Sequence, residues 1–255
     1  MKSKKFSRLT GILARIAITI AAMGFVLLLR PDIASWALGK VQAEARVVAS
    51  PRVVADYIRN NAVRKLQIGA GDNSKPDWLN TDIEPQSGQS YLDAGRPFPL
   101  PDRSFKYVYS EQVIEHLPYE QGLVMLKESY RVLAPGGAVR LATPNLTKFI
   151  ALFQESKTPE MRDYLEAKLR WHKWPRTPDL ECYILNRQLR EWGHQFVYTP
   201  KMMRASLAAA GFSQIKEFPV GESDDPALRN LEDRANWEAS GANAYEAMIF
   251  QAIRE

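Results

Sequence analysis

A glycine turn that directly follows a short apolar strand constrains the fold of this 255-residue chain more than any other feature. Residues 66–68 (Leu-Gln-Ile) are typical of a buried strand, and residues 69–72 (Gly-Ala-Gly-Asp) come immediately after it. Glycine allows a sharp turn and lets a ligand approach the backbone where a side chain would collide. We therefore expect a ligand to lie against Gly69 and Gly71, at the carboxyl end of this strand.

Strands and helices alternate along the rest of the chain. The pattern predicts further strands over residues 79–83, 107–110, 138–143, 212–218 and 245–253, and helices over residues 119–133 and 200–210. Upstream, Asp32 and the pair Ser50-Pro51 are expected to start two separate helices. Such alternation is typical of a mostly parallel α/β sheet with helices on both faces, whose sites lie at the carboxyl ends of the strands.

Two carboxylates follow the glycine turn in an order that suits an adenosine ligand. Asp82 ends the second strand, and an ionised carboxylate offers two acceptor oxygens to a ribose diol. Asp93 follows a further short strand and can meet a base. A nicotinamide dinucleotide fits less well, because its fingerprint needs a third glycine that opens a helix. Ser74 stands at that position, and the segment between Gly71 and the second strand is too short for a full helix.

Several stretches carry a family resemblance. They read LQIGAGD (66–72), LNTDIEP (79–85), PFPLPDRSFKYVYSEQVIEHL (97–117), LKESYRVLAPGGAVRLATPN (126–145) and WGHQFVYT (192–199). Together they resemble the class I S-adenosylmethionine-dependent methyltransferases, and most of all the subgroup related to the type 11 methyltransferase domain that is associated with envelope and glycan genes. The resemblance implies a Rossmann-like sheet with an antiparallel last strand. It also implies S-adenosylmethionine as the cofactor.

The resemblance further implies where the cofactor binds. The implied cofactor-binding residues are Gly69, Ala70, Gly71, Asp82, Ile83, Asp93, Ala94, Ser110 and Glu111. The glycine turn would lie under the methionine part, Asp82 would hold the ribose hydroxyls, and Asp93 would flank the adenine edge. The chain departs from the family pattern at Lys106, where the family usually has a structural aspartate. The short stretch after the glycine turn is a second departure, and it predicts a more exposed cofactor.

Glu115, His116 and His194 are the candidate catalytic residues. Some relatives bind magnesium through Glu-x-x-Glu-His, but Gln112 replaces the first glutamate here, and hard dications favour several carboxylate oxygens. We therefore expect no metal, and expect Glu115 and His116 to shape the pocket floor or to cap the next helix.

With an unperturbed pKa of about 6.5, His194 could take a proton from a hydroxyl as the methyl group transfers. Its alternative role is that of a structural histidine that positions a loop.

Residues 146–199 are expected to form a substrate-facing insertion. Basic side chains surround Trp171 and Trp174 there, at positions 168, 170, 172, 173 and 176. Cations beside tryptophan suit a sugar or a phosphate-bearing headgroup. The competing interpretation is a solvated basic helix end with one tryptophan in the core.

The N-terminal quarter differs from the rest of the chain in charge. Residues 1–64 hold 11 basic and 3 acidic residues, and an apolar run with Arg15 inside it spans residues 9–29. We divide the chain into an N-terminal segment, residues 1–49, and a methyltransferase domain, residues 50–255. The apolar run is long enough to span a bilayer, and it could also lie on a membrane surface, be cleaved, or pack on protein. Membrane association is the expectation, with the catalytic domain in the cytoplasm, where S-adenosylmethionine is made.

Charge and composition limit the available functions. Residues 65–255 hold 23 basic and 26 acidic residues, a balance that disfavours nucleic acid as a partner. The single cysteine, Cys182, excludes an internal disulfide framework. We predict a methyltransferase that acts on a hydroxyl of an envelope glycan, a lipid-linked sugar or a small metabolite. The alternative is a methyltransferase-fold scaffold protein without turnover, and the sequence does not specify the oligomeric state.

Overall fold

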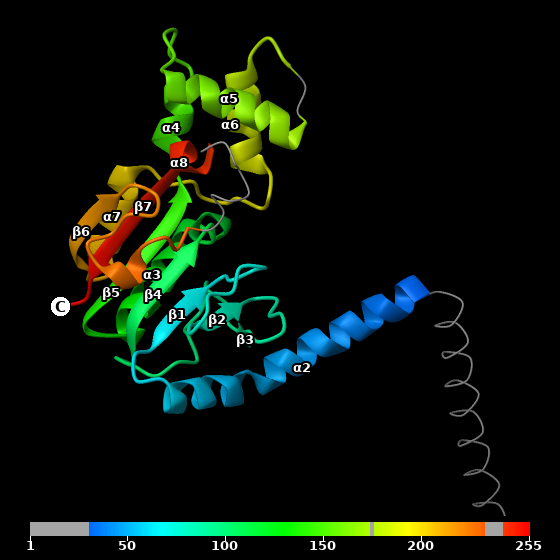
Figure 1. Cartoon of the computed structure of the whole chain (residues 1–255), viewed down its shortest axis with the longest axis vertical. Helices are drawn as coiled ribbons and strands as arrows, with labels where there is room; N and C mark the ends of the chain where they lie inside the picture. Colours follow the sequence, from blue (N-terminus) through cyan, green and yellow to red (C-terminus); the bar gives the residue numbers. More distant parts are fainter. Residues whose placement is uncertain (1–30, 174–175, 233–241) are drawn as a thin grey trace, which may run out of the picture. The chain divides into compact units, whose positions relative to one another are not determined.

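The computed structural model of the chain describes residues 31–173, 176–232 and 242–255 (Figure 1). The chain divides into two units, residues 1–48 and 49–255, and the sheet belongs to the second unit. The strands are β1 (Lys65–Ile68), β2 (Leu79–Asp82), β3 (Ser90–Tyr91), β4 (Phe105–Glu111), β5 (Leu133–Pro144), β6 (Ser213–Phe218) and β7 (Ala247–Ile253). The helices are α2 (Pro31–Asn60), α3 (Tyr119–Val132), α4 (Leu146–Ala151), α5 (Pro159–His172), α6 (Leu180–Arg190), α7 (Pro200–Ala209) and α8 (Ala242–Glu246), with short 3₁₀ helices η1 (Ile114–His116) and η2 (Pro226–Leu228).

Within the described residues, seven strands form one sheet in the order β3-β2-β1-β4-β5-β7-β6. The strands from β3 to β5 pair in parallel, whereas β7 lies antiparallel between β5 and β6. The chain runs outward from β1 in one direction and returns to β4 on its other side, so the strand order reverses between β1 and β4. This confirms the predicted Rossmann-like sheet with an antiparallel last strand, and it places the expected ligand crevice at the ends of β1 and β4.

One face of the sheet carries the main hydrophobic core. Leu66, Val108 and Val139 lie side by side on β1, β4 and β5, and all three are fully buried. Side chains of α3 and α7 pack on this face, together with Val53 and Tyr57 from the end of α2. Because alternate residues of a strand point to the same face, this row of aliphatic residues fixes which side of each strand meets the helices.

The opposite face is covered differently from the prediction. Its cluster joins Tyr107, Tyr109 and Trp78 to Leu228 and Leu231, and no α-helix in the described part of the chain contributes to it. The expected helices on both faces are therefore replaced here by loops and η2. The physical reason is chain length, because the connection from β1 to β2 is too short to cross the sheet as a helix.

Helices α4, α5 and α6 gather beyond the carboxyl end of β5 (Figure 1). They share a second hydrophobic cluster with Tyr245 of α8. Side-chain oxygens of Asn145, Thr158 and Asp179 accept hydrogen bonds from backbone N–H groups in the first turns of these three helices. Tyr245 thus belongs to a helix, and the last strand begins at Ala247 rather than at the predicted residue 245.

Helix α2 corrects the prediction of two helices before the sheet. It is continuous from Pro31 to Asn60 and contains Pro51 in its interior. The Ser50 hydroxyl, expected to cap a second helix, accepts a hydrogen bond from the backbone N–H of Tyr91 at 2.7 Å. A proline removes one backbone donor from a helix, and here this loss does not end the helix.

The predicted location at a membrane is also corrected. Across residues 31–173, 176–232 and 242–255, no helix combines the length and the apolar character needed to cross a membrane. The apolar run of residues 9–29, on which the prediction of a membrane-associated N-terminal helix rested, lies outside the described residues.

Candidate active site

A cavity of about 290 Å³ opens where the strand order reverses, at the carboxyl ends of β1, β2 and β4. Its walls are formed by Ile68, Gly69, Gly71, Asp82, Ile83, Leu92, Asp93, Ala94, Gln112, Val113, His116 and Leu117. Most of the predicted cofactor residues are in this set, together with one predicted catalytic residue, His116. The cavity is near the lower end of the size range of ligand pockets, roughly 300–1,000 Å³.

The two glycines of the turn meet different surroundings. Both adopt a left-handed backbone, with φ of +68° at Gly69 and +50° at Gly71. A Cβ atom added to Gly69 would lie 2.2 Å from Cγ2 of Val113, whereas nothing lies within 4 Å of one added to Gly71. Gly69 is therefore required by the packing of Val113 as well as by the turn. Gly71 leaves open space on the cavity side, where a ligand can approach the backbone.

Asp82 is held in a fixed orientation at the end of β2. Its Oδ2 atom accepts a hydrogen bond from the backbone N–H of Gly71, and its Oδ1 atom accepts one from Glu84, both at 2.9 Å. Each carboxylate oxygen can accept more than one hydrogen bond. The carboxylate can therefore still accept hydrogen bonds from a diol in the cavity while it stays attached to the glycine turn.

Asp93 and Ala94 also form part of the cavity wall. The Oδ1 atom of Asp93 accepts a hydrogen bond from the Gly95 backbone at 2.9 Å, and Oδ2 pairs with the exposed Arg96 at 3.0 Å. Ile83 lies on the same side and is 58% exposed. An exposed aliphatic side chain at the rim of a cavity provides a surface on which a flat ring can pack.

Three of the predicted cofactor residues do not line the cavity. Ala70 and Ser110 are 2% exposed, and Ser110 lies beside Ile68 in the sheet rather than in the cavity wall. Glu111 accepts a hydrogen bond from the Tyr109 hydroxyl at 3.1 Å, on the loop-covered face. The difference from the prediction arises at the end of β4, where the chain leaves the strand and Gln112 and Val113 line the cavity. Gln112 takes a left-handed backbone with φ of +54°, which its residue type does not indicate.

Lys106, the departure from the family pattern, has a structural role on the other end of β4. Its ammonium group donates a hydrogen bond to the backbone carbonyl of Gly136 at 2.6 Å. The lysine thereby connects the start of β4 to the first part of β5.

The three predicted catalytic residues lie together, although their chain positions are far apart. Glu115 and His116 belong to η1, and His194 lies in the loop between α6 and α7. The rings of His116 and His194 are 4.8 Å apart and nearly perpendicular. Backbone N–H groups of Gln195 and Phe196 both donate to the Glu115 carbonyl, at 2.8 and 3.1 Å, and so hold the loop against η1.

One hydrogen bond of the His194 side chain determines which of its ring nitrogens carries the proton. Nδ1 lies 2.6 Å from the backbone carbonyl of Gln188, and a carbonyl can only accept, so Nδ1 carries the proton. Burial lowers the pKa of His194 below 6.5, while the hydrogen bond to Gln188 opposes that shift. The ring is therefore mostly neutral near pH 7, with a lone pair on Nε2. Glu115 is fully buried, and its Oε2 accepts a hydrogen bond from the Thr143 hydroxyl at 3.0 Å.

The predicted basic cluster of the insertion is only partly present. Lys168 is 3% exposed and forms an ion pair with Glu246 at 3.0 Å, so it is part of the interior. Arg176 lies at the surface and pairs with Glu166 at 3.0 Å. The side chain of Trp171 and the whole of Trp174 lie outside the described residues.

Comparison with known proteins defines the class of this site. The protein family described as "Methyltransferase domain" matches residues 67–141, which include the second half of β1, the glycine turn, Asp82, β4 and most of β5. This stretch is similar to methyltransferase domains, and the cofactor is S-adenosylmethionine. No curated protein matches the sequence.

Several solved structures are similar in fold. One is a methyltransferase from Thermotoga maritima, described as a possible histamine N-methyltransferase, with 14% identity over 90% of this chain and all of that one, at a TM-score of 0.43. A methyltransferase from Mesorhizobium loti is 16% identical over 81% of this chain and 97% of its own, at a TM-score of 0.44. Phosphoethanolamine N-methyltransferase 2 from Haemonchus contortus is 13% identical over 80% of this chain and 52% of its own, at 0.39.

The residues of the cavity fit S-adenosylmethionine on their own chemistry. Gly71 gives access to the backbone, Asp82 offers acceptors for the ribose hydroxyls, and Ile83 offers an apolar surface for the adenine. When it is bound, the cofactor supplies an activated methyl group on a sulfonium. The remaining requirement is an acceptor group that reaches this methyl group.

Proposed function

We propose that the protein methylates a hydroxyl oxygen of an envelope glycan, a lipid-linked sugar or a small metabolite. The observation that carries the proposal is the position of His116. It lines the cofactor cavity, and its ring lies 4.8 Å from that of His194, which is outside the cavity wall. An acceptor that reaches the methyl group from this side would meet polar, proton-accepting side chains. The acceptor class rests on the family resemblance.

The reaction requires alignment more than acid–base chemistry. The acceptor oxygen attacks the methyl carbon, the carbon–sulfur bond breaks, and its electron pair stays on sulfur as S-adenosylhomocysteine leaves. The acceptor loses one proton in the process. Holding the two reactants in line can contribute much of the rate enhancement, of the order of 7–11 kcal/mol in favourable cases. The glycine turn and Asp82 hold the donor, and the loop 191–196 would position the acceptor.

We propose His194 as the residue that receives the acceptor proton in the metal-free site. Its neutral ring has a lone pair on Nε2, because Nδ1 donates to Gln188. Positioned general bases contribute about 10²–10⁴-fold to a rate. His194→Ala should therefore reduce turnover by at least about tenfold, while binding of S-adenosylmethionine is retained. Turnover within a few-fold of wild type would refute this role.

The experiment that tests the proposed function uses the full chain and methyl-labelled S-adenosylmethionine. The protein is incubated with fractionated cell extract, and the fraction that takes up the label is identified. At a subsaturating cofactor concentration Asp82→Asn should strongly reduce the uptake, whereas Glu84→Gln, an exposed carboxylate two residues away, should not. Fragmentation of the product by tandem mass spectrometry, with NMR of the labelled methyl group, then distinguishes a methyl ether from a methylated nitrogen.

Two outcomes would contradict the proposal. Binding of S-adenosylmethionine without uptake of label in any fraction would favour the scaffold alternative. A product methylated on nitrogen or carbon would retain the methyltransferase and reject the hydroxyl acceptor.

A further inference from the structure

Glu115, His116 and His194 together have the composition of a metal site. One ligand atom from each of the three lies within 4.8 Å of the other two. Two imidazoles and one carboxylate are the protein ligands of many sites that bind a transition dication and keep one coordination position open. We propose that these three residues bind a divalent transition metal ion beside the cofactor cavity. The prediction of no metal from the sequence tested only Gln112, Glu115 and His116 as ligands. It did not include His194.

The side chains are held as metal ligands usually are. His194 donates from Nδ1 to the Gln188 carbonyl, which leaves Nε2 for the ion. Glu115 accepts a hydrogen bond from Thr143 through Oε2. Metal-binding histidines and carboxylates almost always have such second partners, which fix the ring or carboxylate in one orientation.

The distances allow an ion after a small adjustment. Zinc lies about 2.0–2.1 Å from nitrogen ligands, so tetrahedral ligand atoms are about 3.4 Å apart. The present spread of up to 4.8 Å would contract by about 1.4 Å. His194 lies in a loop and is half-buried, so its side chain can make this movement without repacking the core.

The donor set indicates the kind of ion. Magnesium prefers oxygen ligands and keeps several waters, whereas imidazole suits zinc, iron, cobalt and nickel. With two nitrogens among three ligands, the site favours a transition dication. Gln112 lines the cavity beside His116.

The catalytic role of the ion rests on the proposed function. The binding of the ion to these three residues does not depend on that function. Because His116 belongs to both the cluster and the cavity wall, the open coordination position would lie next to the methyl donor. A hydroxyl in that position would be polarised by the ion and would release its proton to water as the methyl group transfers. His194 is then a ligand instead of the base.

The test measures metal on the untagged full chain without cofactor or acceptor. Elemental analysis after incubation with Zn²⁺ and desalting should give one ion per chain, and Co²⁺ should give visible absorption bands. His116→Ala and His194→Ala should each weaken Zn²⁺ binding at least about 100-fold, since loss of a second partner alone costs about 10–100-fold. Glu120→Gln, an exposed carboxylate four residues after His116 in the chain, is the matched control and should bind as wild type does.

Glu115→Gln should also weaken Zn²⁺ binding. Because Glu115 is fully buried, the thermal melting curve of this variant is first compared with that of wild type to show that it folds. Stoichiometry near zero in the folded wild-type protein would overturn the proposal. So would binding that survives both histidine substitutions. Zinc binding without methyl uptake would count against the proposed function alone. Methyl uptake that is unchanged by a chelator, in a protein without bound Zn²⁺, would count against the metal site alone.

Discussion

The backbone N–H of Gly71 donates a hydrogen bond to Oδ2 of Asp82 at 2.9 Å. The carboxylate expected to hold the ribose is therefore attached to the glycine turn expected to lie under the methionine part. This contact connects the two halves of the cofactor cavity across β1 and β2. A change at either residue should therefore alter the binding of both the ribose and the methionine part of the cofactor.

Asp82→Asn should weaken S-adenosylmethionine binding about 10–100-fold. The amide retains one acceptor oxygen but loses the charge, and a hydrogen bond to a charged group is worth about 1.5–3 kcal/mol. Isothermal titration calorimetry on the full chain measures the change. Glu84→Gln is the control and should bind as wild type does. Equal affinity of Asp82→Asn and wild type would show that Asp82 does not contact the ribose.

Gly69→Ala should destabilise the fold more than Gly71→Ala. Both positions have a left-handed backbone, which costs a residue with a Cβ roughly 1–2 kcal/mol. Only at Gly69 does the new Cβ also collide with Val113, and such overpacking costs about 1–3 kcal/mol more. Urea unfolding measures both variants. In a double-mutant cycle, Val113→Ala should recover part of the loss at Gly69 and none at Gly71.

How much of this site could be predicted depends on how far apart its parts lie in the sequence. The glycine turn, Asp82 and Asp93 could be predicted, because each directly follows a strand and the ends of parallel strands meet at one edge. Val113 could not, since its place against Gly69 depends on how β4 ends. The pairing of His116 with His194 also could not be predicted, because backbone hydrogen bonds to Glu115 bring the two loops together.

The errors in the fold have the same origin. Lys168 has the sequence pattern of a surface cation, yet it is buried because Glu246, far along the chain, supplies the opposite charge. Ser50 and Pro51 have the local pattern of a helix start, yet the helix continues through them and the serine contacts β3. Local patterns predicted the sheet well, because most of its strands are short, continuous runs of buried residues. The burial of Lys168 and the contact of Ser50 depend on residues that are distant in sequence, and local patterns could not predict them.

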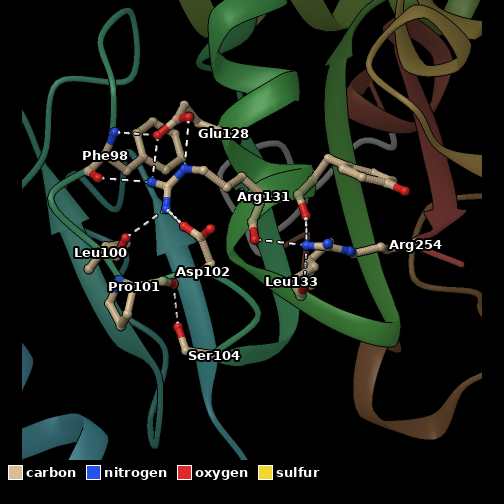
Figure 2. A network of polar contacts seen from close by, with 10 residues as sticks. Phe98, Leu100, Pro101, Asp102, Ser104, Glu128, Arg131, Leu133 and Arg254 are labelled. Carbon is tan, nitrogen blue, oxygen red and sulfur yellow. Dashed lines mark hydrogen bonds and ion pairs between the residues drawn. The ribbon is translucent and has the colours of Figure 1, made fainter.

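Glu128 should make the stability of the fold depend on acidic pH. Figure 2 shows Glu128 between the Arg131 guanidinium and the backbone N–H of Phe98. The hydrogen bond from Arg131 lowers the pKa of Glu128 below 4.5, burial opposes this, and the Phe98 N–H lowers it further. The unfolded chain therefore binds more protons, so this contribution is present above about pH 4.5 and is lost as pH falls through the folded value.

Glu128→Gln should accordingly lose less stability than wild type between about pH 6 and pH 3. Chemical denaturation at a series of pH values measures this slope. Glu155→Gln, at an exposed carboxylate, is the control and should keep the wild-type slope. A slope for Glu128→Gln equal to that of wild type would refute the role of Glu128.

Arg140 and Glu232 should be the most sensitive ion pair of the fold. Both side chains are fully buried, with Arg140 Nε 2.6 Å and Nη2 2.9 Å from the two carboxylate oxygens of Glu232. Glu232 also accepts the backbone N–H of Gly221 at 2.9 Å, so the pair holds the loop that covers the second face of the sheet.

Removing one partner leaves the other charge buried and alone, which typically costs about 3–5 kcal/mol. Arg140→Met and Glu232→Met should each lower the free energy of unfolding by about this amount. The double variant should be less destabilised than the sum of the two, because no unpaired charge remains. Urea denaturation of the four proteins gives the coupling energy directly. Additive losses would mean that the two residues stabilise the fold independently, contrary to the geometry of the pair.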